Sequence, residues 1–233
     1  MLFMFTPAQA RQLAAVADAA SKDAYRPVIG AVLFTYEFDK GGRAEVNAIA
    51  TDSYVLARRR LRLNDLQAVE EEEAPATRHK ATGDAPGQVL VPAKEWKVAL
   101  KEAAKEAKFG EVEFWITPDR KEVKVQVEMG DKLTYRRTLS PIEGQFPDWK
   151  KLMPEVWLRD GELALPCLDP TKLVQLASCV STLPSERGNK PWRIGASAGA
   201  GTNGELKPWG FVIPEGVDDP SELTCLVMPV RIP

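Results

Sequence analysis

Cysteine and histidine are scarce in this chain of 233 residues. Its three cysteines, Cys167, Cys179 and Cys225, are too few and too widely spaced for a disulfide framework or a Cys-x-x-Cys metal site, which favours a reducing compartment. The single histidine, His79, has no second histidine, reactive cysteine or paired acid near it in the sequence. It is therefore more typical of a surface residue than of a catalytic base or a metal ligand.

Long hydrophobic runs and an excess of charge of one sign are also missing. No stretch approaches the ~18 consecutive apolar residues of a membrane span, and the N-terminal MLFMFTPAQA has no basic segment that would mark a signal peptide. We therefore expect a cytoplasmic protein with no membrane association. Because the formal net charge is only −2, any contact with nucleic acid requires a local basic patch on an acidic body.

Motifs for catalysis or cofactor binding are not evident either. Residues 199–204 fit the dinucleotide-binding pattern G-x-G-x-x-G, but Pro208 follows too soon for a long helix and no parallel βαβ pattern surrounds them. That segment is more typical of a flexible loop. Because the sequence also has no P-loop, zinc-ligand or serine nucleophile motif, we expect no enzyme activity, no metal and no cofactor.

The sequence does contain a segment, residues 91–108, whose faces can be distinguished on a helix of about 100° per residue. One face is apolar, as expected for a stripe that packs on a core, and five lysines gather within roughly 80° of arc on another. A row of ammonium groups can follow a polyanion backbone without reading its sequence, although a charged helix face is often simply solvated. With Arg11 of the first predicted helix, the candidate DNA-binding residues are Lys94, Lys97, Lys101, Lys105 and Lys108.

The first part of the chain predicts a helix followed by two strands. The helix covers residues 6–20, with Thr6 as N-cap and a proline at its first position. The strands cover residues 28–38 and, after a turn at 39–42, residues 45–63. Alternation in the second strand places Arg59 on the opposite face from its arginine neighbours, Arg58, Arg60 and Arg62.

The rest of the chain repeats this plan. A polar, aperiodic stretch at 64–87 is a predicted mobile loop, and residues 140–154 form an extended connector. A third helix begins at Asp169 and Pro170. The three helix starts lie about 80 residues apart, so we expect three copies of a unit made of a helix and an antiparallel meander. The predicted strands are 112–116, 123–129, 133–139, 162–168, 192–198, 206–213 and 223–231.

Short motifs in the right order resemble one family, the bacterial DNA polymerase III β sliding clamps. Residues 50–57, ATDSYVLA, are similar to its ATDGHRLA segment, and 143–154, EGQFPDWKKLMP, to its GxFPDYxxVxP connector. Residues 226–232, LVMPVRI, are similar to its last strand, VMPxR followed by an apolar residue. Residues 26–34 and 89–94 also resemble its first strand and the entry to its second helix.

The resemblance implies an α+β sliding-clamp fold, in which helices line a hole for duplex DNA and antiparallel sheets form the outer wall. It implies sequence-independent contact with double-stranded DNA, and partners that include a replicative polymerase and a clamp loader. It also implies an apolar pocket for short partner motifs. Carried over position by position, the pocket residues are Thr51, Ser53, Tyr54, Val55, Leu56, Pro154, Val227, Met228, Pro229, Val230, Arg231 and Ile232.

Two departures from the family pattern bear on these expectations. Ser53-Tyr54-Val55 stands where the pattern has Gly-His-Arg, which alters the pocket. The three predicted helices divide the chain into a complete domain at 1–145, a connector at 146–160 and a half domain at 161–233. A ring lined by about twelve helices, as in the family, then needs four chains, whereas an open oligomer or a monomer is the alternative.

We therefore expect a short, divergent, phage-type sliding clamp that forms a homo-oligomer and has no catalytic role. The alternative is a clamp-derived interaction protein that binds clamp-motif partners without encircling DNA.

Overall fold

The computed structural model describes residues 1–39, 43–63, 86–108, 110–152, 157–158, 169–180, 193–197, 209–212 and 223–228. Several expected features lie outside these residues. They are most of the loop predicted at 64–87, His79, the strand at 162–168, the G-x-G-x-x-G segment and the pocket residues Pro154, Pro229, Val230, Arg231 and Ile232.

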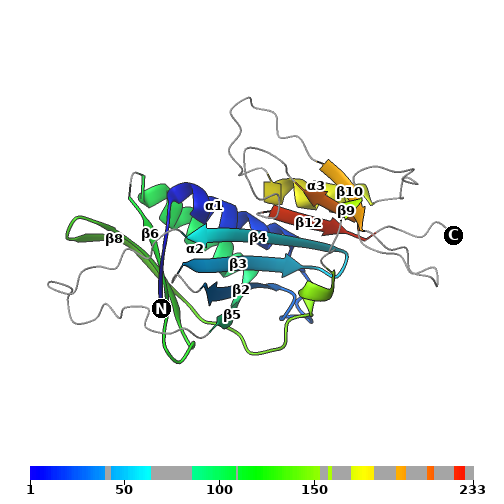
Figure 1. Cartoon of the computed structure of the whole chain (residues 1–233). Coiled ribbons are helices and arrows are strands. Elements are labelled where there is room, and N and C mark those ends of the chain that lie inside the picture. The colour runs from blue at the N-terminus through cyan, green and yellow to red at the C-terminus, as the bar shows by residue number, and fades with distance from the viewer. Residues whose placement is uncertain are drawn as a thin grey trace.

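Each unit in the described residues consists of a strand, a helix and a three-stranded meander (Figure 1). The first unit is β1 (Leu2–Phe5), α1 (Pro7–Ala15), the 3-10 turn η1 (Val16–Ala19), β2 (Ala31–Phe38), β3 (Ala44–Thr51) and β4 (Val55–Leu63). The second is β5 (Gly87–Pro92), α2 (Ala93–Glu106), β6 (Val112–Ile116), β7 (Val123–Met129) and β8 (Lys132–Leu139). After the 3-10 turn η2 (Trp149–Leu152), the third is β9 (Trp157–Leu158), α3 (Pro170–Val180), β10 (Arg193–Ser197), β11 (Trp209–Val212) and β12 (Leu223–Val227).

Local sequence signals explain where the helices begin. The Thr6 hydroxyl accepts a hydrogen bond from the Gln9 backbone N–H at 3.2 Å, and the Gln9 side chain accepts one from the Thr6 N–H at 2.9 Å. This capping box satisfies two N–H groups that the first helical turn leaves free. In α3, the Asp169 carboxylate accepts the backbone N–H of Thr171 at 2.8 Å, which confirms the predicted start of that helix.

The first two units exchange their first strands. β1 joins the meander of the second unit by pairing with β6, with Phe3 opposite Phe114. β5 joins the meander of the first unit by pairing with β2, with Leu90 opposite Leu33. Neither β1 nor β5 was predicted as a strand from the sequence. Because each unit completes the other's sheet, the described residues of these two units form one structural body.

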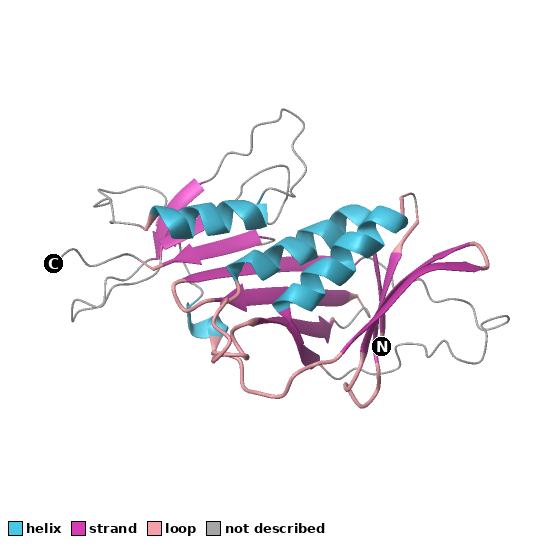
Figure 2. Cartoon of the chain, turned by 180° about the vertical axis from the view of Figure 1, so that it is seen from behind, coloured by secondary structure: helices cyan, strands magenta, loops and turns pink. Residues whose placement is uncertain are grey.

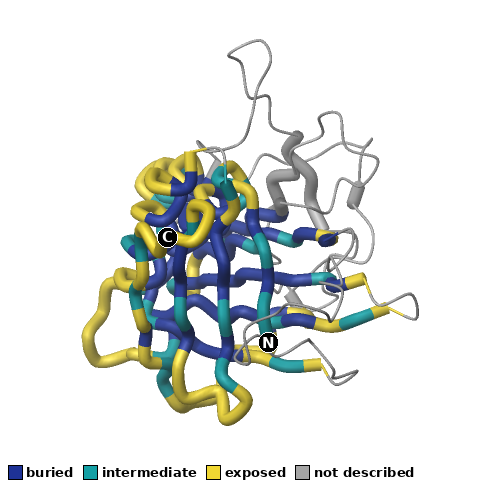
Figure 3. Tube along the Cα trace, turned by 90° about the vertical axis from the view of Figure 1, so that its left-hand side faces the viewer, coloured by how far each residue is buried: buried dark blue, intermediate teal, exposed yellow. Residues whose placement is uncertain are grey.

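The core lies between the helix layer and the sheets (Figure 3). The rings of Phe34 and Phe114 lie 4.9 Å apart, and Trp96 packs edge-on against Phe114 at 5.4 Å. The Trp96 indole N–H donates to the Leu13 carbonyl at 2.9 Å, so α2 is fixed against α1 by a buried hydrogen bond as well as by packing.

The third unit continues the sheet of the first. β12 pairs with β4, with Val227 opposite Val55, and the described strands form an eight-stranded sheet in the order β5-β2-β3-β4-β12-β11-β10-β9. The other sheet has the order β1-β6-β7-β8. Figure 2 shows α1, α2 and α3 together on one side of the strands. Helices on one side and antiparallel sheets on the other confirm the predicted α+β architecture.

The expected single strand at 45–63 is wrong, because the chain turns between Thr51 and Val55. The Asp52 carboxylate accepts the backbone N–H groups of Tyr54 and Val55, both at 2.9 Å, and Ser53 has a φ of 83°. This local hydrogen bonding competes with strand pairing and ends β3. The predicted alternation nevertheless holds, since Arg59 is buried on the helix side and donates to Gln12 at 2.8 Å.

Residues 140–152 of the expected connector pass over the outer face of the eight-stranded sheet. The Ile142 N–H donates to the Leu90 carbonyl at the edge of β5, at 2.8 Å. Trp149, in η2, is buried in a small apolar cluster on that face, which we call the outer cluster. Its other buried members are Ala31, Leu33, Ile49, Leu56, Leu90 and Leu226.

In the described part of the chain, no helix combines the length and the hydrophobicity needed to cross a bilayer.

Candidate functional site

The predicted lysine row lies along α2, with Lys108 just after its last residue, and faces solvent along most of its length. Lys94, Lys101, Lys105 and Lys108 are exposed. Lys97 differs, because it is half-buried and its ammonium forms an ion pair with Asp18 of η1. Arg11 is exposed on α1, and its guanidinium reaches the Ala104 carbonyl near the end of α2 at 3.4 Å. The structure therefore brings all six predicted cations to the helix layer.

Glu102, on α2, contacts side chains of β8. The Glu102 carboxylate accepts the Tyr135 hydroxyl at 3.1 Å and lies 3.3 Å from Arg137 Nη1. Burial, and then the Glu102 carboxylate, raise the pKa of Tyr135 to about 12. With this acid held by the sheet edge, the lysine side of α2 keeps an excess of positive charge.

The turn between β3 and β4 places the first group of predicted pocket residues. The Thr51 hydroxyl donates to the Val55 carbonyl at 2.6 Å and accepts the Ser53 N–H at 3.1 Å. The Ser53 hydroxyl in turn accepts a hydrogen bond from the Arg26 guanidinium at 2.8 Å. These contacts fix the turn so that the Tyr54 side chain remains 60 % exposed.

β12 brings the second group of pocket residues to the same place. The Met228 N–H donates to the Tyr54 carbonyl at 2.8 Å. Val55, Leu56 and Val227 are buried, so these three residues build the sheet beneath the turn rather than an open surface. The structure thus brings together the seven predicted pocket residues that it describes, and Tyr54 and Met228 are the apolar ones among them that reach the surface.

Lys172 is a residue at this turn that the sequence did not single out. Its ammonium lies 2.5 Å from the Asp52 carboxylate and 5.2 Å from the centre of the Tyr54 ring. Burial opposes ionisation of Asp52, but the hydrogen bonds from Lys172 and from the turn's N–H groups outweigh it and hold the pKa of Asp52 below its ordinary value. No local pattern reveals this contact, since the two residues are 120 positions apart.

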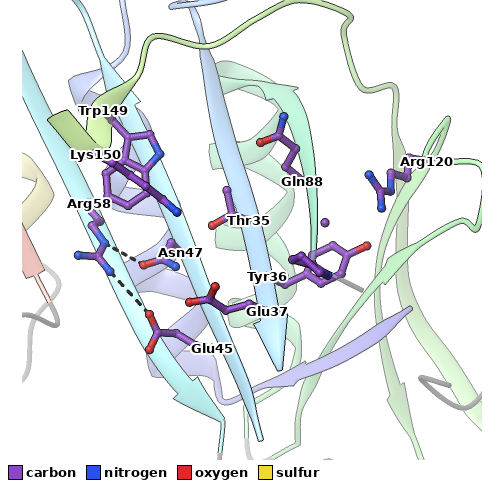
Figure 4. Close-up of a pocket in the computed structure, with 12 residues that line it drawn as sticks. Thr35, Tyr36, Glu37, Glu45, Asn47, Arg58, Gln88, Arg120, Trp149 and Lys150 are labelled. Atoms are coloured by element: carbon purple, nitrogen blue, oxygen red, sulfur yellow. Dashed lines mark hydrogen bonds and ion pairs between the residues drawn. The ribbon is translucent and has the colours of Figure 1, made fainter. Parts of the chain in front are cut away.

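A polar groove of about 680 Å³ opens on the outer face of the eight-stranded sheet (Figure 4). The Arg58 guanidinium donates to Asn47 at 2.8 Å, lies 3.7 Å from Glu45 and stacks 5.1 Å from the centre of the Trp149 ring. Burial, and then the neighbouring Arg60, lower the pKa of Arg58. Lys150 lies beside Trp149, and Arg120 lies on the other side of the groove. The described lining contains both signs of charge but no nucleophile with an adjacent base.

Within the ranges that the structure describes, no three histidine, cysteine, aspartate or glutamate side chains are grouped to hold a metal ion. The described residues thus form three surface features: a basic helix layer, a turn joined to β12 and a polar outer groove.

The chain has the sliding-clamp fold. Its units exchange their first strands, and a layer of helices lies on one side of antiparallel sheets. No protein-family model matches the sequence, and no curated protein matches it as a relative. Solved structures do match it. The β chain of DNA polymerase III from Streptococcus pneumoniae superimposes with a TM-score of 0.63 at 16% identity and covers 100% of this chain.

Two further crystal structures give the same result. The DNA polymerase sliding clamp of Bacillus subtilis has a TM-score of 0.63 at 16% identity, and the DNA polymerase III β subunit of Thermotoga maritima has 0.64 at 11%. Both cover 100% of this chain, which spans 64% and 66% of theirs and 65% of the S. pneumoniae chain. The resemblance inferred from the sequence motifs is therefore confirmed as a likeness of fold, over about two thirds of those proteins.

Proposed function

We propose that this chain is a sliding-clamp-like processivity factor, a non-catalytic protein that keeps a replicative polymerase on duplex DNA. The fold supports this proposal, and so does the position of the lysine row. The observation that carries it is that Lys94, Lys101 and Lys105 are exposed on α2, within a helix layer that lies on one side of the sheets (Figure 2).

The lysine row suits contact with DNA that must move. Ammonium groups attract phosphates without reading base sequence, and the attraction weakens as salt replaces the released counterions. Because such contacts are alike at every position of the duplex, a protein that holds DNA in this way can slide. The near-neutral total charge is compatible with this role, since a local row of cations, and not the total charge, makes the contact.

Encircling DNA requires more than one copy of a chain of this size, so we propose a homo-oligomeric ring. The described strands leave the outer edge of β8 without a neighbouring strand. An exposed strand edge offers unpaired N–H and C=O groups to a strand of another chain. We also propose that the turn at Thr51–Val55 and the end of β12 receive peptide motifs of the polymerase and of a clamp loader, with Tyr54 and Met228 as apolar contacts.

The DNA contact can be tested with charge reversal. The double variant Lys101→Glu/Lys105→Glu should lose nearly all affinity for a fluorescent duplex in an anisotropy titration. The matched control, Lys121→Glu/Lys124→Glu, makes the same change in charge at the β6–β7 turn and in β7, and should retain most of the affinity. Equal binding by both variants would refute the assignment of the lysine row.

The alternative function is an interaction protein that binds clamp-motif partners without encircling DNA. It is favoured by the turn and β12, whose hydrogen bond between Met228 and Tyr54 forms within a single chain. Light scattering coupled to size exclusion, at micromolar and nanomolar protein, separates the two functions. An oligomer that resists dilution supports the ring, whereas a stable monomer of 25.7 kDa leaves the peptide site as the function.

A further inference from the structure

A groove of about 680 Å³ opens in the helix layer, where the third unit meets the first two. One wall is the start of α2 together with η1 and the segment after it, and the other wall is α3. Small residues also line it, among them Ala17, Ala20 and Gly30. The groove exists because pairing of β12 with β4 sets α3 beside η1. The sequence did not predict it, since no local pattern places α3 next to α2.

The groove carries an excess of positive charge. Three lysines are among its lining residues, Lys22, Lys94 and Lys97, against a single acidic residue, Asp18. Asp18 is already paired with Lys97. Lys22 and Lys94 are exposed, and neither has an ion-pair partner among the described residues. Two lysines of the lining are therefore not neutralised by a carboxylate of the described residues.

The opposite wall adds a neutral hydrogen-bond donor. Gln175 lines the groove from α3 and is half-buried, and its side-chain amide has no hydrogen-bond partner in the described part of the chain. The α3 cation, Lys172, is held by Asp52 and does not line the groove. An anion between the walls would thus meet lysines on one side and an amide on the other, an arrangement that suits a phosphate oxygen.

We propose that this groove seats a backbone phosphodiester of the bound nucleic acid between α2 and α3, which rests on the proposed function. Continuity with the lysine row favours a phosphodiester over an acidic peptide. Lys94 lies both at the groove and at the start of that row, and Lys101 and Lys105 follow it at about 10 and 16 Å along α2. A phosphate backbone that follows the row therefore reaches the groove. The consequence is that nucleic acid bridges the third unit to the first two.

Cysteine crosslinking tests this seat directly. Gln175→Cys places a thiol in the groove, and the matched control, Ala177→Cys, places one at an exposed position of the same helix that does not line it. The probe is a duplex with a bromoacetamide group on one backbone phosphorothioate, which forms a thioether with a nearby thiol and releases bromide. The unsubstituted chain gives the background from its own cysteines. We expect at least about tenfold more crosslinking at position 175 than at 177.

A second variant tests the charges. The double change Lys22→Gln/Lys94→Gln, made in the Gln175→Cys background, should abolish the crosslink. It should also reduce the slope of log affinity against log salt concentration by about 0.9 for each phosphate that the protein no longer neutralises. Equal crosslinking at 175 and 177, with the Lys101→Glu/Lys105→Glu variant still defective, would overturn the seat and leave the proposed function standing. Failure of the unsubstituted chain to bind any duplex would overturn both.

Discussion

The ammonium of Lys172, on α3, lies 2.5 Å from the carboxylate of Asp52, in the turn between β3 and β4. This ion pair joins the third unit to the first at the turn that we propose as a peptide site. The side chains are 25% and 10% exposed, so the pair is partly shielded from water. The same ammonium lies over the Tyr54 ring at 5.2 Å, which places the exposed aromatic and the ion pair in one cluster.

Removing the ammonium should destabilise the docked third unit. We expect Lys172→Met to lower the free energy of unfolding by about 1–3 kcal/mol at pH 7, because it leaves a shielded carboxylate without its charged donor. The pKa of Asp52 is lower in the folded protein than in the unfolded chain, where it is about 4. The ionised Asp52 therefore stabilises the fold above about pH 4, and this contribution is lost as the pH falls through the pKa of the folded state. Urea unfolding at pH 7 and pH 2.5 measures both effects. Lys101→Met, at an exposed lysine, is the control, and a difference that persisted at pH 2.5 would contradict this account.

Gly87 should not tolerate a side chain. A Cβ at this position would overlap ring atoms of Tyr36, which is buried and packs 5.3 Å from Phe3. We expect Gly87→Ala to cost about 1–3 kcal/mol in unfolding free energy, since the ring has little room to move. Gln88→Ala, at the next and exposed residue, should be nearly neutral. If Gly87→Ala cost as much unfolding free energy in a Tyr36→Leu background as in the unsubstituted chain, the clash would not be the cause.

The connector should depend on Trp149. This indole is 8% exposed, belongs to the outer cluster and lies 5.1 Å from the Arg58 guanidinium. Trp149→Ala should cost about 3 kcal/mol in unfolding free energy by emptying the cluster, and Trp149→Phe should recover most of that loss. Hydrogen exchange provides a local measurement, because the Ile142 N–H that bonds Leu90 should lose protection in the alanine variant. Unchanged protection of this amide would show that the connector is held by other contacts.

Cys225 should be inert in the folded protein. The side chain is 1% exposed, and burial raises its pKa to about 12. At pH 8 its thiolate fraction is then on the order of a thousandfold below that of an ordinary cysteine, and the reagent must also reach a buried site. Alkylation followed by peptide mapping should label Cys225 only after denaturant is added. Rapid labelling of the native protein would mean that β12 leaves β4 readily.

The fold was largely predictable from sequence where the pattern is local. The lysine row, the caps at Thr6 and Asp169, the meander of β6, β7 and β8 and the inward position of Arg59 follow from periodicity and short-range hydrogen bonding, which act on neighbouring residues. The family motifs added the sliding-clamp architecture. The assignments of DNA contacts and peptide contacts stay predictions, because they concern molecules that the chain's own packing does not specify.

The tertiary structure decided the relationships between residues that are distant in the sequence. β1 and β5 are short apolar segments that become strands by pairing with the meander of the other unit, so their own sequence carries little signal. Asp18 neutralises Lys97, Lys172 reaches Asp52, and α3 forms a groove with α2 because β12 pairs with β4. The sequence by itself determined which segments form helices and most of the strands and which faces carry charge, because those choices depend on a few adjacent side chains. Only the folded chain decided which charges meet, because that depends on pairing energies between segments far apart in the chain.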